Sequence, residues 1–172
     1  MTENDVYLNK DEKTMAEMNQ YLTFKLGNEN YGLILEKAKE IIKPPKITNV
    51  PNTEKHVMGV INIRGKVTPV IDLKEKLGLP KKYIDEDSNK IIIINIEGIM
   101  VGLFIDNVRE VVSIKNKNIE KTDEGDRSIE AEYIKGVFTN ENNLIVIIDI
   151  EEILFGYNNS LEEVKNAWKR YN

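Results

Sequence analysis

The stretch of sequence that decides the fold is residues 59–73, GVINIRGKVTPVIDL, together with its counterpart at residues 136–150, GVFTNENNLIVIIDI. Each stretch contains two short runs rich in Val and Ile on either side of a polar turn, a pattern typical of two strands joined by a hairpin. Each also carries an Asp, Asp72 or Asp149, that can cap a following helix. We therefore predict that one strand–turn–strand–helix unit occurs twice in the chain.

A second matched block precedes each of these units. A shift of 77 residues aligns the two stretches above, whereas a shift of 70 places residues 21–42 over residues 91–112. The difference requires a seven-residue insertion in the polar segment between about 113 and 133, where a longer solvated loop costs little. We infer an internal duplication with copies at about 20–80 and 90–156. The superimposed pairs include Gly32/Gly102, Leu33/Leu103, Glu40/Glu110, Ile41/Val111 and Gly59/Gly136.

Each copy contains about five strands and a short helix. Unbroken apolar runs such as residues 91–94 suggest strands that are covered on both faces. Five strands favour a small antiparallel barrel, a form that removes exposed edges. Because units of about 65 residues are marginal alone, we expect the two barrels to share an apolar interface. Helix signals are the same in both copies: Asp72 and Asp149 as caps, Glu75 and Glu152 reaching back to them, and Gly78 and Gly156 as stops.

Two segments flank the repeats. Residues 1–19 are polar, and we predict a disordered tail, followed by a single domain of interleaved barrels over residues 20–157. Residues 158–172 are predicted to form an amphipathic helix, which either packs on the barrels or docks a partner. Its apolar face consists of Leu161, Val164, Trp168 and Tyr171.

Composition excludes several classes of protein. The chain has 24 Lys and Arg against 29 Asp and Glu, a net charge of −5 that argues against nucleic-acid binding. The absence of Cys excludes a thiolate zinc site and a cysteine nucleophile, and His56 is the only histidine. No apolar run approaches the roughly 20 residues that cross a bilayer, and the polar first residues are unlike a signal peptide. We predict a cytoplasmic protein without direct membrane insertion.

Catalytic motifs are weak throughout the sequence. Residues 59–66 superficially resemble a phosphate loop, but the glycine spacing is wrong and Val67 replaces the Ser or Thr that binds magnesium. The acidic segment 120–132 lacks the spacing of a calcium loop. We therefore predict no catalytic residue, metal or cofactor, and favour a binding protein. Within that class Arg64 stands out at a hairpin tip, where Glu141 occupies the matched position.

The motifs together resemble the CheW-type chemotaxis coupling proteins. The resemblance runs from about Gln20 to Phe155 and is carried by QYLTFKLGNENYGL, VMGVINIRGKVTPVIDL, VGLFIDNVREVV and LIVIIDIEEIL. It implies two five-stranded SH3-like barrels. It also implies a non-enzymatic adaptor, monomeric alone, that joins chemoreceptor cytoplasmic tips to the CheA histidine kinase in arrays at the inner face of the membrane.

The resemblance also implies roles for particular residues. Ala38 and Glu40 match the family's kinase-binding region, although Ala38 is smaller than the Val often found there. Ile91 and Val111 match the receptor-facing groove between the barrels. The residues that match the family's hairpin, implicated in coupling receptor and kinase, are Gly59, Asn62, Arg64 and Gly65. A small-ligand sensor on the same barrels and an enzyme remain the alternatives.

Overall fold

The computed structural model describes residues 17–81, 86–122 and 131–156. The first copy of the repeat contains β1 (Met18–Leu26), β2 (Glu29–Ile34), the 3-10 turn η1 (Leu35–Lys37), β3 (Ala38–Ile42), β4 (Val57–Ile63), β5 (Lys66–Asp72) and α2 (Leu73–Lys76). The second contains η2 (Glu86–Ser88), β6 (Lys90–Ile96), β7 (Ile99–Ile105), β8 (Asn107–Lys115), η3 (Asn116–Asn118), η4 (Ala131–Tyr133), β9 (Ile134–Asn140), β10 (Asn143–Ile148) and α3 (Ile150–Phe155). The predicted mainly β fold is confirmed.

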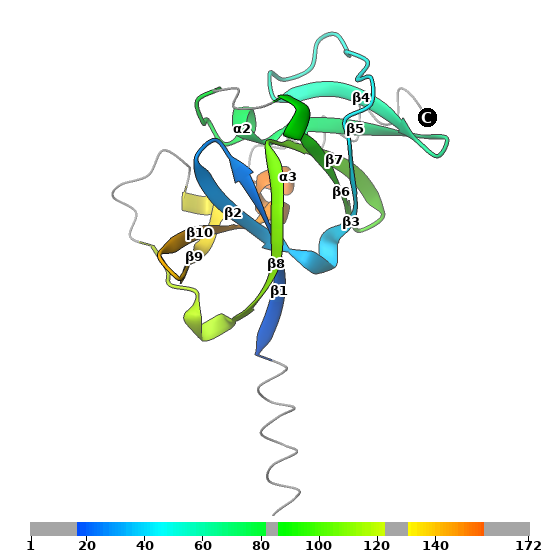
Figure 1. Ribbon diagram of the computed structural model, residues 1–172. Coiled ribbons are helices and arrows are strands. Elements are labelled where there is room, and N and C mark those ends of the chain that lie inside the picture. Colours follow the sequence, from blue (N-terminus) through cyan, green and yellow to red (C-terminus); the bar gives the residue numbers. More distant parts are fainter. Residues whose placement is uncertain (1–16, 82–85, 123–130, 157–172) are drawn as a thin grey trace, which may run out of the picture.

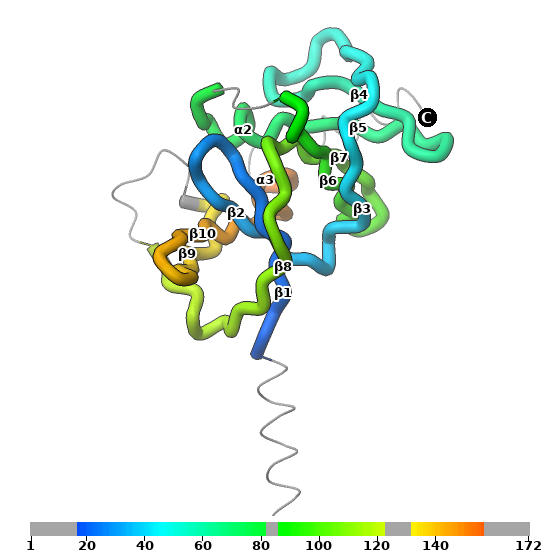
Figure 2. The backbone as a smooth tube through the Cα atoms, in the orientation of Figure 1, coloured from blue at the N-terminus to red at the C-terminus, as the bar shows by residue number. Residues whose placement is uncertain are grey.

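The ten strands form two five-stranded sheets, each of which takes strands from both copies of the repeat. The first barrel has the order β8-β1-β2-β10-β9 and the second β3-β6-β7-β5-β4. In Figures 1 and 2 the chain leaves the first barrel after β2, builds the second from β3 to β7, and returns with β8 to β10. The five strands of one copy therefore do not make one barrel, as the strand count of each copy had suggested; the copies exchange strands, and the two barrels are interleaved.

Strand registers repeat in the two barrels. Ile147 of β10 lies opposite Gly32 of β2 in the first barrel. The repeat shift of 77 relates Ile147 to Val70, and the shift of 70 relates Gly32 to Gly102. Val70 and Gly102 lie opposite each other in the second barrel. Both of these pairings are parallel, so the expectation of purely antiparallel barrels is also wrong. The equal register in both barrels supports the internal duplication.

One isolated bridge closes each barrel. Thr48, in the segment after β3, pairs with Val60 of β4, and Glu120, in the segment after β8, pairs with Val137 of β9. In each barrel the paired segment crosses the glycine next to the bridge, Gly59 or Gly136, where an added Cβ would meet backbone atoms of that segment. A Cβ on Gly59 would lie 2.1 Å from the carbonyl oxygen of Thr48, so this glycine is needed for the barrel to close.

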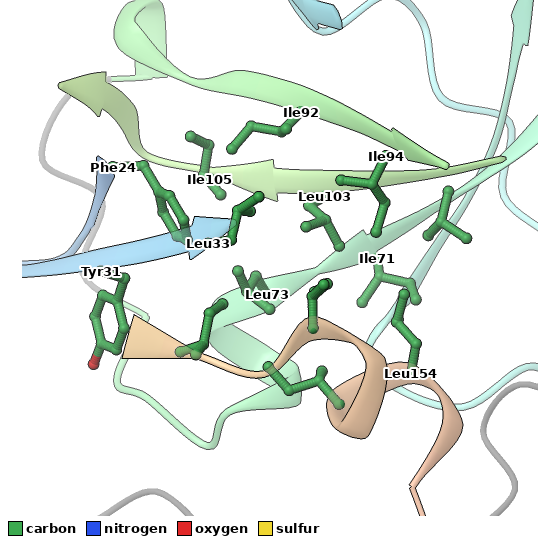
Figure 3. Packing of buried hydrophobic residues seen from close by; sticks show 14 of the residues in the cluster. Phe24, Tyr31, Leu33, Ile71, Leu73, Ile92, Ile94, Leu103, Ile105 and Leu154 are labelled. Atoms are coloured by element: carbon green, nitrogen blue, oxygen red, sulfur yellow. The ribbon is translucent and has the colours of Figure 1, made fainter. Parts of the chain in front are cut away.

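The two barrels share one apolar core. β1 and β2 contribute Phe24 and Leu33, β6 and β7 contribute Ile94 and Leu103, and α3 contributes Leu154. Figure 3 shows these side chains pointing toward one another between the sheets and the helices. Burial of each such side chain stabilises the fold by about 1.5–3 kcal/mol. The predicted shared interface is thus confirmed, and it makes one structural unit of the two barrels.

Core strands are buried on both faces, as the unbroken apolar runs suggest. Along β6, Ile92 and Ile94 face the shared core, whereas Ile91 and Ile93 belong to a separate cluster inside the second barrel. Cβ-branched residues suit such strands because successive side chains alternate between two packed faces. The interior of the first barrel contains the matching cluster of Tyr21, Ile114, Ile145 and Ile147.

The short helices begin at the predicted caps. Asp72 accepts a hydrogen bond from the backbone N–H of Glu75 at 3.3 Å, and Asp149 does the same for Glu152 at 3.2 Å. The reciprocal part of the predicted capping box is wrong, because the N–H of Asp72 donates to the carbonyl of His56 instead. α2 ends at Lys76, and Gly78, two residues further on, has a φ of +70°.

The flanking predictions are tested only in part. β1 begins at Met18, so the predicted tail of residues 1–19 extends two residues too far. Residues 1–16, the predicted helix at 158–172 and most of the acidic segment 120–132 lie outside the described residues. Among the residues that the structure describes, no helix is long and apolar enough to cross a membrane.

Candidate functional site

The β4–β5 hairpin carries half of the site residues singled out from the sequence. Ile63 pairs with Lys66, which leaves Arg64 and Gly65 as a two-residue turn. Both turn residues have positive φ, +49° and +81°, the conformation favoured in tight hairpins. The Asn62 side chain accepts a hydrogen bond from the Gly65 N–H at 2.8 Å and holds the turn in this shape. The Arg64 side chain is thereby presented at the tip.

Arg64 contacts Glu40 across the closed barrel. Its Nη2 lies 3.0 Å from Oε1 of Glu40, although β3 and β4 are at opposite ends of the sheet order. The Arg64 side chain is 77% exposed and that of Glu40 31%, so the ion pair contributes at most about 1 kcal/mol to stability. Both charges therefore remain available to a partner. Ala38, at the start of β3, pairs with Ile94 and is half-buried.

Of the two residues expected to line a receptor groove, only one is accessible. Val111 of β8 is 47% exposed, an unusual state for a Val within a sheet. Ile91 is 0% exposed and packs with Ile61 and Val70 inside the second barrel. The expectation that Ile91 faces a groove does not hold in this structure, because the pleat of β6 turns its side chain inward.

Ile41 is a surface residue that the sequence interpretation did not single out. It lies next to Glu40 on β3 and is 43% exposed. The shift of 70 residues relates it to Val111, and the two occupy equivalent places: Ile41 pairs with Ile92 and Val111 with Leu22. Each barrel therefore exposes one Cβ-branched apolar residue on a strand at the end of its sheet order. The repeat alignment, which superimposes Ile41 on Val111, could have identified Ile41 from the sequence.

An open depression adjoins the first barrel and has a volume of about 310 Å³. It lies beside the start of β1 and the end of β2, and Met18, which is 36% exposed, is the most accessible apolar residue along it. Its lining consists of Met18, Asn19, Gln20, Ile34, Leu35 and Glu36. Such a mixed apolar and polar surface suits a protein contact better than a small apolar ligand.

Asp72, Asp149 and His56 have structural surroundings. Asp72 and Asp149 cap helices, as described above. His56 is buried, with Nδ1 3.2 Å from Oε2 of Glu54, and burial lowers its pKa, further lowered by the charge of Lys76. Within residues 17–81, 86–122 and 131–156, no group of three or more His, Asp or Glu side chains could hold a metal ion.

Comparisons with known proteins agree on one family. The family model described as CheW-like domain matches residues 20–155. The chemotaxis protein CheW of Bacillus subtilis is 37% identical over 133 residues, which cover 77% of this chain and 85% of the relative. The chemotaxis protein CheW of Klebsiella aerogenes is 32% identical over 135 residues, 78% of this chain and 81% of the relative.

A solved structure shows the same fold. The scaffolding protein TtCheW of Thermoanaerobacter tengcongensis superimposes with a TM-score of 0.73 at 33% sequence identity, covering 79% of this chain and 87% of that one. Exchanged strands, paired barrels and an exposed Arg-Gly hairpin thus define this molecule as a paired β-barrel protein. The chain belongs to the CheW-like domain family.

Proposed function

We propose that this protein is a non-enzymatic adaptor that couples the cytoplasmic tips of chemoreceptors to the CheA histidine kinase. The observation that carries the proposal is the Arg64–Glu40 pair, a charged surface feature that the fold does not need for stability. Family membership supports it, since the matched relatives are chemotaxis proteins and the matched structure is a scaffolding protein. The adaptor acts in the cytoplasm as a monomer that joins receptor arrays at the inner face of the membrane.

The kinase contact is assigned to the second barrel. Glu40 and Ala38 on β3 and the hairpin with Asn62, Arg64 and Gly65 lie side by side because the Arg64–Glu40 contact joins them. A planar guanidinium can pair with a carboxylate of the kinase, and the neighbouring exposed Ile41 adds apolar area. Gly59 contributes indirectly by allowing the barrel to close beneath the hairpin.

The receptor contact is assigned to the first barrel. Val111 on β8 and the depression beside β1 provide partly exposed apolar side chains within reach of a helical partner. A receptor tip presents helices, and a helix binds such a surface through residues at i, i+3 and i+4. The two contacts lie on different barrels, so one adaptor can hold both partners at once.

Reversal of charge at the hairpin tests the proposal. Arg64→Glu is expected to leave the fold intact, because the side chain is exposed, and to lower recovery of the kinase by about tenfold or more in a co-sedimentation assay with CheA and receptor fragments. Lys135→Glu, the same charge change at an exposed position on β9, serves as the matched control and should bind normally. Unchanged recovery with Arg64→Glu would refute the assignment of Arg64.

Exchanging the two charges distinguishes a contact of Arg64 with the kinase from its ion pair with Glu40 within the chain. Arg64→Glu combined with Glu40→Arg restores an ion pair within the chain but presents the opposite charge at each position. If Arg64 meets a kinase carboxylate, the double variant stays defective. If binding returns to the wild-type level, the pair acts only within the chain, and the kinase contact must be sought elsewhere.

A further inference from the structure

Two hairpins of the second barrel end in turns of the same design. The turn between β4 and β5 reads NIRG at residues 62–65, and the turn between β6 and β7 reads NIEG at residues 95–98. The third and fourth residues have φ values of +49° and +81° in the first turn and +51° and +85° in the second. In each turn the Asn side chain accepts a hydrogen bond from the glycine N–H, at 2.8 Å and 2.9 Å. Glu97 is therefore held at a hairpin tip in the same way as Arg64.

Both tips lie at the same end of the second barrel. β5 and β7 are neighbours in the sheet and run parallel, with Val70 opposite Gly102. Each strand begins directly after its turn, at Lys66 and at Ile99, so the two turns lie at the end from which both strands start. In Figure 1 both hairpins extend toward the same side of the molecule. Because neighbouring strands are only about 5 Å apart where they pair, one partner surface can contact both tips.

The Glu97 carboxylate forms no ion pair within the part of the chain that the structure describes. The residue is exposed to solvent. A positive φ suits Gly or Asn, whereas it is strained for Glu. Strained backbone is found mainly at functional sites. A Glu at this position is therefore better explained by a contact outside the chain than by the needs of the turn.

The first barrel lacks this arrangement. The shift of 70 places Gly27 at the position of Glu97, and the shift of 77 places Glu141 at the position of Arg64. Gly27 adopts a φ of +63° without strain, and its N–H donates to Oδ2 of Asp106 at 2.6 Å, which ties this tip to the rest of the fold. Two opposite charges at neighbouring tips are therefore a property of the second barrel.

We propose that Glu97 is a second contact with the kinase and pairs with a basic side chain, next to the carboxylate that meets Arg64. This inference rests on the proposed function, since the kinase must already meet the Arg64 hairpin. Opposite charges at two neighbouring tips fix the orientation of the partner, because a partner turned around would face like charges at both tips. Glu97 therefore contributes to specificity for the kinase as well as to affinity.

Glu97→Asn distinguishes a contact with the kinase from an effect on the turn. Asn favours a positive φ, so this variant should have a melting temperature equal to or above that of the wild type. Recovery of CheA in the co-sedimentation assay should nevertheless fall at least threefold, and further with Glu97→Lys. Glu86→Lys, the same charge change at an exposed position of η2, serves as the control and should bind normally. Normal kinase binding by both Glu97 variants would overturn the proposal, as would a loss of binding that is accompanied by a lower melting temperature.

Parallel measurements separate this inference from the proposed function. Arg64→Glu is measured in the same assay, and each variant is also tested with the receptor fragment alone. Loss of kinase binding with Arg64→Glu but not with the Glu97 variants would refute only the Glu97 contact. No loss with any of these variants would also refute the assignment of the kinase to the Arg64 hairpin. Loss of receptor binding with intact kinase binding would assign Glu97 to the receptor and overturn the proposal.

Discussion

Gly59 lies where the backbone of Thr48 crosses β4, and it has a φ of +145°. Gly65, at the tip of the same hairpin, has a φ of +81° but open space around it. Both glycines belong to the hairpin signature, yet only one of them is confined by its neighbours. Loss of function in a Gly59 variant would therefore report on barrel closure rather than on a contact with a partner.

We expect Gly59→Ala to lower the free energy of unfolding by about 3 kcal/mol or more, because the new Cβ would overlap the Thr48 carbonyl oxygen, which is held by backbone pairing. Gly65→Ala should cost only about 1–2 kcal/mol, the strain of a positive φ. Urea unfolding of both variants measures the difference. Similar losses at the two positions would show that the crossing strand can move aside.

His56 gives stability a dependence on pH. Burial lowers its pKa from the ordinary 6.5, so the folded state holds it neutral while the unfolded chain binds a proton more readily. Stability is therefore fully present above pH 6.5 and falls as the pH drops below that value, until the lower pKa of the folded state is reached. Glu54, close to Nδ1, opposes the shift without cancelling it.

The expected result is a decrease in the free energy of unfolding between pH 7.5 and pH 5.5 for the wild type, and a smaller decrease for His56→Leu. Urea titrations at several pH values provide the measurement. Parallel curves for the two proteins would assign the pH dependence to other groups. Glu75, whose pKa Lys55 and Lys81 lower, titrates below this range and does not interfere.

At the scale of elements, each short helix forms an ion pair with a segment that connects strands of different barrels. Lys74 of α2 meets Asp106 after β7 at 2.8 Å, with both side chains nearly buried, and Asp106 also accepts from the Gly27 N–H. Its counterpart joins Glu151 of α3 to Lys37 of η1 and is more exposed. The shift of 77 relates Lys74 to Glu151, so the charge on the helix is reversed between the copies, whereas the shift of 70 relates Asp106 to Glu36, the neighbour of Lys37.

Lys74→Met should destabilise the protein by about 3–5 kcal/mol, because Asp106 would keep a buried charge without its cation. Lys37→Met removes the cation of the other, more exposed pair and should cost less than about 1 kcal/mol. Thermal unfolding of the two variants is the measurement. A small loss for Lys74→Met would mean that water reaches Asp106.

Features set by neighbouring residues could be predicted from the sequence. The two-residue hairpins, the Asp caps and the exposed Arg64 depend on a few consecutive side chains and on backbone geometry that they dictate. Which strands the two copies exchange could not be predicted in this way, because β2 pairs with β10, more than one hundred residues along the chain. Ile91 was misjudged for a related reason: which face of β6 points inward is decided by its distant partners.

At the scale of the whole molecule, strand exchange makes each half of the chain depend on the other. Residues 17–81 provide two strands of the first barrel and three of the second, and the rest comes from the second copy. Neither half contains a complete sheet or its own core, so a cut between the copies should leave two fragments that fold only together.

We expect fragments 1–83 and 84–172 to be largely unfolded when separate and to form a one-to-one complex with the β-sheet signal of the intact chain when coexpressed. A tag on one fragment, followed by size-exclusion chromatography and circular dichroism, measures this. Cooperative unfolding of fragment 1–83 alone would contradict it, since that result requires a complete core within the first copy.

Exchange of strands also sets an order of events during synthesis on the ribosome. The second barrel has all its strands once β7 has emerged, whereas β1 and β2, made first, lack β10 until nearly the end of the chain. The apolar side chains of β1 and β2 therefore stay exposed until the strands that complete the shared core have been synthesised. The oldest part of the nascent chain is thus the last to be enclosed, and a chaperone that binds the emerging amino-terminal hairpin would protect it longest.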